Sequence, residues 1–301
     1  MFGAIVGDIA GSKYEFNNLR SKDFPLFSEG CDFTDDTVMT IAVANALHTY
    51  RAEKSLTAFR DEVASQMRKL GREYPGRGYG GRFAGWLADE SMGPYNSLGN
   101  GSAMRVSPVA WAAGSIEEAE TLAKVSAEPT HNHPEGIKGA QAVAAAIYMG
   151  RIRKSKKEIR NYIEEKYYKL DFTLDEIRPA YKFNATCPGS VPQAIEAFLE
   201  SESFEDAIRN AVSIGGDSDT IAAIAGSIAE AFYGEVPADI KNKAMSYLSE
   251  ELRICCGIFA AECDDSQDAG AVMGEFLTNI LHVFGQAAAE KKWLSSEREI
   301  I

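Results

Sequence analysis

Apolar residues recur along this chain at the three-to-four-residue spacing of α-helices. No stretch shows the strict alternation, rich in Val, Ile, Thr and Tyr, that is typical of strands. The pattern therefore predicts an all-α protein. Short connections marked by Gly, Pro or Asn separate the expected helices. These helices span residues 2–11, 35–50, 55–70, 79–90, 103–113, 116–127, 134–150, 156–167, 190–200, 204–214, 218–232, 239–251 and 268–292.

The chain has 301 residues, of which 45% are apolar, and no fixed-period repeat or low-complexity linker divides it. A chain of this length and apolar content can build one large core. We therefore expect a single multi-helix domain over residues 1–301. The basic run RIRKSKKEIR (151–160) has no interleaved aromatic residues, so it predicts a solvated helix start rather than a nucleic-acid patch.

The net charge of −13 disfavours bulk electrostatic binding to nucleic acid or to an acidic membrane. The five cysteines lack the spacing of a disulfide framework or a zinc site, which indicates a reducing compartment. The first residues lack a basic region and include Asp8, which argues against a signal peptide, and no window is long and apolar enough for a membrane span. We expect a cytoplasmic monomer with no membrane or nucleic-acid partner.

Two turns place acidic residues directly before apolar helices. In TDDT (34–37), Asp35 and Asp36 stand between threonines, and taken alone this turn is explained by helix capping. GGDSDT (215–220) has the same arrangement and opens a helix that is apolar on nearly every face, so its acids are expected to lie deep. Buried carboxylates must be paired, protonated or metal-bound, and neither turn has a cationic neighbour in sequence.

If the two turns face each other, carboxylate and hydroxyl oxygens converge, and a polyvalent cation would neutralise them. Hard oxygen donors without adjacent Cys or His suit Mg²⁺ or Mn²⁺ and disfavour zinc. Four carboxylates could hold two ions roughly 3.5–4 Å apart, as in two-metal hydrolytic sites. Calcium stays open, although neither turn has EF-hand spacing.

Five motifs in order resemble those of the ADP-ribosylglycohydrolase family. They are GDIAGSKYE (7–15), TDDT (34–37), GNGSAMRVSP (99–108), THNHPEG (130–136) and GGDSDTIAAIAGSIAEAFYG (215–234). The resemblance covers most of the chain. It implies an all-α fold with a dinuclear cleft for two Mg²⁺ or Mn²⁺ ions. It also implies hydrolysis of the bond between the distal ribose of ADP-ribose and an acceptor, which is a protein side chain or a small conjugate.

The resemblance also implies a set of site residues. Glu15 would be the catalytic acid/base or would position water, although an exposed glutamate in a turn is the alternative. Asp8 is expected to support the site through hydrogen bonds rather than bind metal. One ion would be held by Thr34, Asp35, Asp36 and Asp219, and the other by Asp217, Asp219 and Thr220, with Asp219 bridging. The implied substrate-binding residues are Gly99, Asn100, Gly101, Ser102, His131, Gly189 and Ser190.

The GNGSAM turn predicts an anion cradle, because its glycines permit close backbone approach and Ser102 stands at an expected helix start; an ordinary turn is the alternative. Ser107 and the following proline predict a new N-cap. His131 and His133 do not share a helix face, so they do not predict a zinc site. Leu98 stands where some relatives carry an aromatic residue that stacks on the ligand, and Tyr95 or another aromatic residue could substitute for it.

Other classes of protein fit less well. DDTVM lacks the later acid of a terpene-synthase DDxxD box, and no histidine of THNHPEG is followed by Asp as in an HD phosphohydrolase. An ADP-ribose-binding module without catalytic activity is the remaining alternative. The acceptor linkage, the choice between Mg²⁺ and Mn²⁺ and the stereochemistry of hydrolysis are left open by the sequence.

Overall fold

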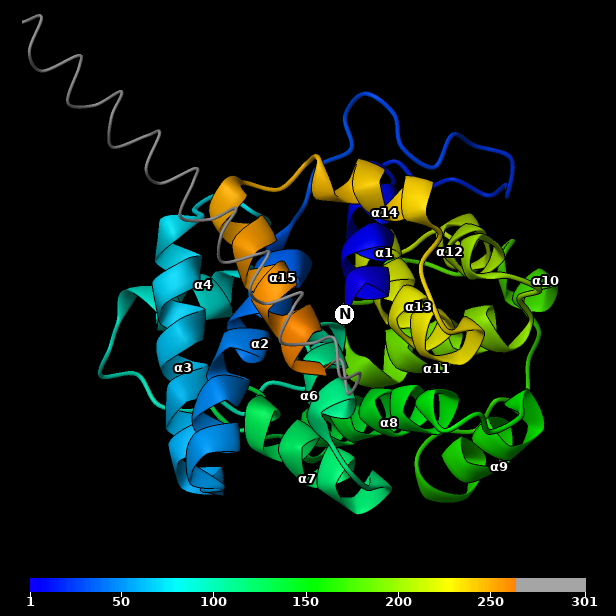
Figure 1. Ribbon diagram of the computed structural model, residues 1–301. Helices are drawn as coiled ribbons and strands as arrows, with labels where there is room; N and C mark the ends of the chain where they lie inside the picture. The colour runs from blue at the N-terminus through cyan, green and yellow to red at the C-terminus, as the bar shows by residue number, and fades with distance from the viewer. Residues whose placement is uncertain (264–301) are drawn as a thin grey trace, which may run out of the picture. The chain divides into compact units, whose positions relative to one another are not determined.

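The computed structural model describes residues 1–263, which contain helices and no strand. Met1–Ser249 form one unit, and α15 (Glu250–Cys263) belongs to a second. The expected helix 268–292 lies outside the described residues, and one domain over 1–301 stays a prediction. The first unit (Figure 1) consists of α1 (Phe2–Ser12), α2 (Asp35–Glu53), α3 (Leu56–Glu73), α4 (Gly81–Ala88), α5 (Gly101–Met104), α6 (Ser107–Ala112), α7 (Ile116–Ala127), α8 (Pro134–Arg151), α9 (Lys156–Lys166), α10 (Leu174–Ile177), α11 (Cys187–Leu199), α12 (Phe204–Ser213), α13 (Ser218–Tyr233) and α14 (Ala238–Met245).

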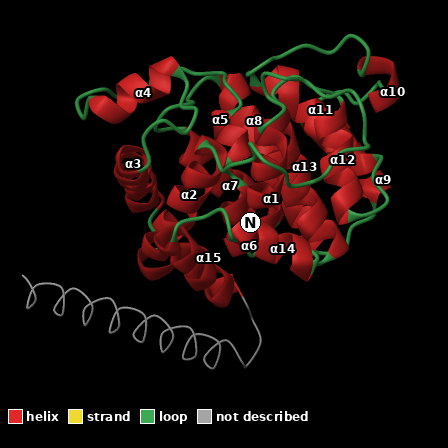
Figure 2. Cartoon of the chain, turned by 90° about the horizontal axis from the view of Figure 1, so that it is seen from above, coloured by secondary structure: helices red, strands yellow, loops and turns green. Residues whose placement is uncertain are grey.

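The central helix of the first unit is α13, which is buried from Ser218 to Ala231 and packs against α1, α8, α11 and α12 (Figure 2). Helix α1 is buried over most of its length and lies antiparallel to α13. A Cβ at Gly7 would lie 2.0 Å from the carbonyl oxygen of Ala222, so the two backbones touch where glycine leaves room. The C-terminal end of α1 therefore lies beside the N-terminal end of α13.

Several helices begin where a side-chain oxygen accepts a hydrogen bond from an N–H of the first turn, which would otherwise lack a partner. Thr34 does this for α2 by accepting from the N–H of Asp36. This cap fixes the backbone of the first turn of α2, and so it fixes the positions from which the side chains of Asp35 and Asp36 extend. The other oxygen caps of this kind are Ser55, Ser115, Ser155, Thr173, Thr186 and Ser203, and at the start of α8 the Nδ1 nitrogen of His133 accepts in the same way.

Some helix boundaries differ from the sequence prediction. The expected helix 103–113 is two short helices, α5 and α6, and Ser107 lies inside α6 instead of capping it, because the N-cap is Val106. The expected helix 239–251 breaks over 246–249, between α14 and α15. Apolar spacing continues through both breaks, so periodicity alone does not show them. The single-turn helix α10 is too short to produce a periodic signal.

No helix in residues 1–263 combines the length and the apolar character that crossing a membrane requires.

Replacing Gly7 with alanine is expected to lower the free energy of unfolding by about 3 kcal/mol or more, because the new methyl group would force α1 away from α13. The matched control is Gly85→Ala in α4, where nothing lies within 4 Å of the new Cβ. Higher helix propensity there predicts a gain of about 0.5–1 kcal/mol. Urea unfolding followed by circular dichroism measures both, and equal stability of the two variants would contradict the close α1–α13 contact.

Candidate metal and active site

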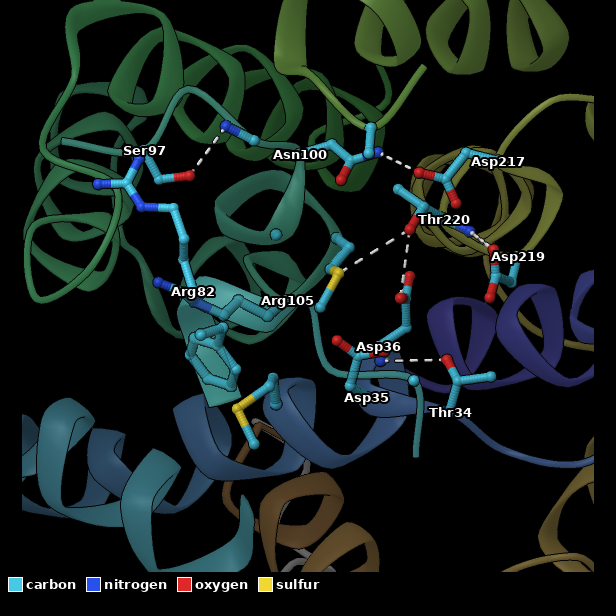
Figure 3. Close-up of a pocket in the computed structure, with 18 of the residues that line it drawn as sticks. Thr34, Asp35, Asp36, Arg82, Ser97, Asn100, Arg105, Asp217, Asp219 and Thr220 are labelled. Carbon is cyan, nitrogen blue, oxygen red and sulfur yellow. Dashed lines mark hydrogen bonds between the residues drawn. The ribbon is translucent and has the colours of Figure 1, made fainter. Parts of the chain in front are cut away.

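The two acidic turns meet at the N-terminal ends of α2 and α13, beside a cavity of about 500 Å³ (Figure 3). The hydroxyl of Thr220 donates to the carboxylate of Asp36 over 3.2 Å, which joins residues 184 positions apart. The prediction that these turns come together is confirmed. The cavity is lined by every residue predicted to bind metal or act in catalysis: Glu15, Thr34, Asp35, Asp36, Asp217, Asp219 and Thr220.

Asp8 of α1 holds the first acidic turn in place. Its buried carboxylate accepts four hydrogen bonds, from the backbone N–H and the hydroxyl of both Thr34 and Thr37. These four donors occupy the sites at which a carboxylate accepts. Burial raises the pKa of Asp8 to about 6, while the hydrogen bonds act in the opposite direction. Asp8 therefore supports the turn through hydrogen bonds, as the sequence predicts.

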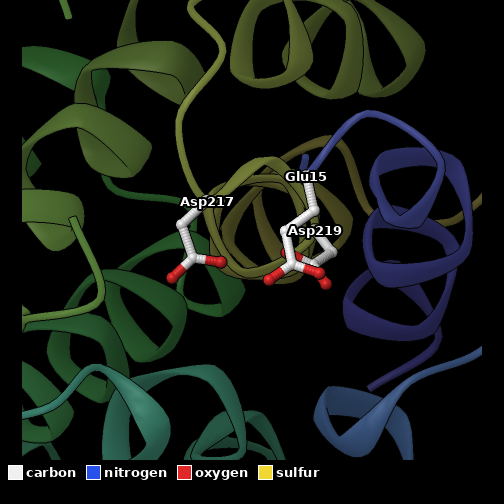
Figure 4. Close-up of side chains that lie close together, drawn as sticks. All are labelled: Glu15, Asp217 and Asp219. Carbon is white, nitrogen blue, oxygen red and sulfur yellow. The ribbon is translucent and has the colours of Figure 1, made fainter. Parts of the chain in front are cut away.

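Glu15 reaches the acidic cluster because it lies just after α1, beside the start of α13. One carboxylate oxygen from each of Glu15, Asp217 and Asp219 lies within 4.8 Å of the other two (Figure 4). The side-chain amide of Asn100 donates to Asp217 over 2.7 Å and orients it. Three carboxylates this close repel one another unless protons or a cation reduce their charge.

Burial raises the pKa of every carboxyl group of the predicted metal and catalytic residues, and repulsion by neighbouring acids adds to the rise in all of them except Asp217. The pKa of Asp35 is raised to about 8 by burial and by Asp8, and the pKa of Glu15 to about 7 by burial and by Asp217. Burial also raises the pKa values of Asp36, Asp217 and Asp219.

The donor set fits a divalent cation. Among the described residues, no Lys or Arg neutralises these acids, and the buried Oδ1 of Asp36 has no hydrogen-bond partner. The candidate ligands are carboxylate and hydroxyl oxygens, which Mg²⁺ and Mn²⁺ prefer. The acidic side of the cavity is therefore a candidate metal centre.

Positive charge lies on the other side of the cavity, where Arg105 is found (Figure 3). Its side chain is buried and donates to the carbonyl oxygen of Ser126 and to the hydroxyl of Thr130. Within residues 1–263 no carboxylate pairs with it, and its Nε has no partner. Burial lowers the pKa of Arg105 to about 10, so the group is still charged at neutral pH.

His131 lies beside the GNG turn and lines the cavity. A Cβ at Gly101 would lie 3.1 Å from Nε2 of His131, so the ring edge faces this turn. Burial and the charge of Arg105 hold the pKa of His131 well below its usual value of 6.5. The imidazole is therefore neutral at physiological pH.

The predicted substrate-binding residues divide into two groups. Gly99, Asn100, Gly101 and His131 line the cavity. The other three are not among the lining residues and contact their neighbours: the Ser102 hydroxyl donates to the carbonyl oxygen of Gly136, the Gly189 carbonyl oxygen accepts from Tyr181, and the Ser190 hydroxyl accepts from Asn100. This second group supports the wall, and its contact with ligand stays a prediction.

The aromatic residues of the cavity wall were largely missed by the sequence analysis. Phe16 is 85% exposed and stacks on Phe183 with ring centroids 6.0 Å apart, and both rings line the cavity. Because Phe16 directly follows Glu15, its place near the site could have been predicted from the sequence. No motif marks Phe183. Tyr95 lines the cavity and Leu98 does not, in agreement with Tyr95 as the substitute aromatic residue.

The glycine-rich segment YPGRGYGG (74–81) is one of the connections that Gly and Pro mark in the sequence, and part of it forms the cavity wall. Gly78, Gly80 and Gly81 line the cavity, and Arg82 follows them. Gly78 has φ +96°, and a Cβ there would lie 3.2 Å from the carboxylate of Asp35. A side chain at this position would therefore enter the acidic cluster.

A family model described as ADP-ribosylglycohydrolase matches residues 1–268 of this chain. The chain belongs to the ADP-ribosylglycohydrolase family. This confirms the family inferred from the five motifs. A solved structure described as an ADP-ribosylglycohydrolase-related protein complex shares the fold, with a TM-score of 0.58 at 22% identity, over 82% of this chain and 94% of that one.

Curated relatives of this family member include two ADP-ribosylhydrolases. ADP-ribosylhydrolase ARH3 of Mus musculus is 28% identical over 312 residues, which cover 77% of this chain and 82% of the relative. The Homo sapiens protein of the same name is 26% identical over 330 residues, covering 81% and 88%. The ADP-ribosyl-dinitrogen reductase glycohydrolase of Rhodospirillum rubrum is 27% identical over 168 residues, covering 53% and 56%.

Adding Mg²⁺ to chelator-treated protein is expected to raise Tm, because a cation relieves the repulsion between buried acids. At a concentration a hundred times Kd the gain is about 2.7 kcal/mol, or roughly 4–5 °C for a domain of this size. Asp219→Asn should lose this shift, while Asp61→Asn, at an exposed acid on α3, should keep it. Differential scanning calorimetry measures the shift, and an unchanged Tm in the unsubstituted protein would contradict a metal centre.

Lowering the pH from 7.5 to 5.5 is expected to cost stability through His131. The unfolded state takes up a proton below pH 6.5 and the folded state does not, so this contribution falls by about 1.4 kcal/mol per pH unit below 6.5. The carboxyl groups with raised pKa values add stability as the pH falls through the same range, so they oppose the effect of His131. Both proteins in the comparison below contain these groups, so their contribution cancels. Urea unfolding of the His131→Gln variant should therefore show less acid destabilisation than the unsubstituted protein, and identical pH dependence would show that His131 is not buried as a neutral ring.

Proposed function

We propose that this protein is a metal-dependent hydrolase that cleaves the glycosidic bond between the distal ribose of ADP-ribose and an acceptor. The acceptor is a protein side chain or a small conjugate. One observation carries the proposal: the cavity of this family member has a carboxylate cluster on one side and a buried, unpaired guanidinium group on the other. A sugar and a diphosphate joined in one ligand match these two sides.

The acidic side would hold two divalent ions, Mg²⁺ or Mn²⁺. Bound ions would supply Lewis acidity toward the vicinal hydroxyls of the ribose and toward water. The hydrogen bonds from Thr34 and Thr37 to Asp8 fix the first turn, and Asn100 fixes Asp217, so the oxygen donors are held before a ligand arrives. The ligands of the two ions would be Thr34, Asp35, Asp36 and Asp219 for one, and Asp217, Asp219 and Thr220 for the other.

Glu15 would manage the proton as the glycosidic bond breaks. Its pKa, raised to about 7 by burial and by Asp217, lets it accept a proton from water and return one near neutral pH. The half-buried position beside Asp217 and Asp219 gives it access to the cavity. Positive charge develops on the ribose in the transition state of glycoside hydrolysis, and the surrounding acids would stabilise it.

The basic side would hold the diphosphate. Arg105 supplies a positive charge that no carboxylate of the described residues neutralises, and the GNG turn offers backbone close to His131. An acidic protein binds such an anion through local groups, because its bulk field is repulsive. We also propose that the protein is a cytoplasmic monomer; its cysteine pattern supports a reducing compartment, and its net charge of −13 disfavours nucleic-acid and acidic-membrane partners.

A binding module without catalytic activity is the second candidate. It would use the same basic side and would not need the acids. The complete set of acids around the cavity, including Glu15, favours the hydrolase, because a module that only binds gains nothing from crowding carboxylates in a buried place.

Incubation of the protein with Mg²⁺ or Mn²⁺ and a panel of arginine-linked, serine-linked and O-acetyl ADP-ribose conjugates is expected to release ADP-ribose from at least one substrate. Asp35→Ala and Asp219→Ala should lose this activity, and the exposed control Asp61→Ala should keep it. Chromatography of the released ADP-ribose measures the rates. Activity that survives chelation or both substitutions would overturn the mechanism, and calorimetric binding of ADP-ribose without turnover of any substrate would favour the binding module.

A further inference from the structure

Arg105, Thr130 and His131 form a chain of hydrogen bonds at the basic side of the cavity, where Arg105 and His131 line the wall. The guanidinium group of Arg105 donates to the Thr130 hydroxyl over 2.9 Å, and that hydroxyl lies 2.7 Å from Nδ1 of His131. The backbone also holds this segment, since the N–H groups of Thr130 and His131 both donate to the carbonyl oxygen of Ala127. All three side chains are buried, so each must satisfy its polar atoms within the chain.

The direction of these hydrogen bonds follows from what each group can do. A guanidinium group has only N–H donors and accepts nothing, so the Thr130 hydroxyl must accept from Arg105. A hydroxyl has one proton, and its remaining partner is Nδ1 of His131. The hydroxyl therefore donates to Nδ1, which must be unprotonated. A neutral imidazole then carries its proton on Nε2.

We propose that Arg105 and Thr130 are positioning residues that fix His131 as the neutral Nε2–H tautomer, so that its ring presents a hydrogen-bond donor to an anionic oxygen in the cavity. This proposal rests on the proposed function for the identity of the ligand, which is the diphosphate of ADP-ribose. Only the Nε2–H tautomer can donate a hydrogen bond from this edge of the ring. The other neutral tautomer would turn a lone pair toward the anion and repel it.

The placement of Nε2 agrees with this role. It is the atom of His131 that comes nearest to a Cβ built at Gly99 or at Gly101, at 3.4 and 3.1 Å. Both glycines line the cavity, so the donor lies beside backbone that a ligand can approach closely. The charge of Arg105 also opposes protonation of the ring, which keeps Nδ1 available to accept from Thr130.

The test compares Thr130→Val, which keeps the shape and removes the hydroxyl, with Thr130→Ser, which keeps the hydroxyl. Two-bond ¹H–¹⁵N correlation spectra of the full chain show which nitrogen of each histidine carries the proton, and His131→Gln assigns the signal. His133 is an internal control, because its Nδ1 accepts from the N–H of Glu135 and does not depend on Thr130. Calorimetry with ADP-ribose gives the affinity.

We expect the Nε2–H tautomer at His131 in the unsubstituted protein and in Thr130→Ser. In Thr130→Val we expect a mixture of tautomers at His131, no change at His133, and an ADP-ribose affinity that falls in proportion to the lost Nε2–H population, by about twofold where the two tautomers are equally populated. The Nδ1–H tautomer in the unsubstituted protein would overturn the proposal without any variant. An altered tautomer with unchanged affinity would also overturn it.

The NMR spectra and the calorimetry test this proposal and the proposed function separately. If the unsubstituted protein shows the Nε2–H tautomer and does not bind ADP-ribose, the proposed function fails and the assignment of the tautomer stands. If it binds ADP-ribose and shows the other tautomer, the proposed function stands and the role of Thr130 fails.

Discussion

The crowding of carboxylates at one side of a buried cavity is the constraint on which the rest of the structure depends. Acids that are taken out of water and placed within about 5 Å of each other destabilise the fold unless protons or a cation reduce their charge. Three of them meet that closely here, and among the described residues no Lys or Arg compensates. The surrounding helices must therefore hold the acids rigidly against their own repulsion.

The scaffold does this with helix ends and backbone contacts. Helices α2 and α13 begin at the cavity, so their first turns present N–H groups and partial positive charge where the acids lie. Gly7 lets α1 touch α13, and this antiparallel contact carries both Asp8 and Glu15 to the same place. Asp8 then fixes the first turn of α2 through Thr34 and Thr37. Local capping, one close helix pair and one buried carboxylate together position the site.

The sequence predicted those parts of the site that depend on short-range pattern. Helical spacing identified the all-α class. The acidic turns before apolar helices identified the candidate metal centre, because a buried carboxylate needs a partner in any fold. It did not predict that Phe183 and the glycine-rich segment form cavity wall, because their role depends on which loops the fold brings together. Ser107 and the proline after it indicated a new helix start after the GNG turn, whereas helical spacing alone predicted one helix over 103–113.

Arg105 provides the local positive charge that an acidic protein needs if it is to bind a dianion. A buried guanidinium group without a carboxylate partner is costly, and the cost persists unless something else supplies the negative charge. No carboxylate of the described residues forms an ion pair with Arg105, although the charge of Asp35 partly opposes the lowering of its pKa by burial. On the proposed function, the diphosphate of ADP-ribose would supply this charge by facing Arg105, while the distal ribose would face the acids. The separation of the two charges across the cavity would then set the direction in which the ligand binds.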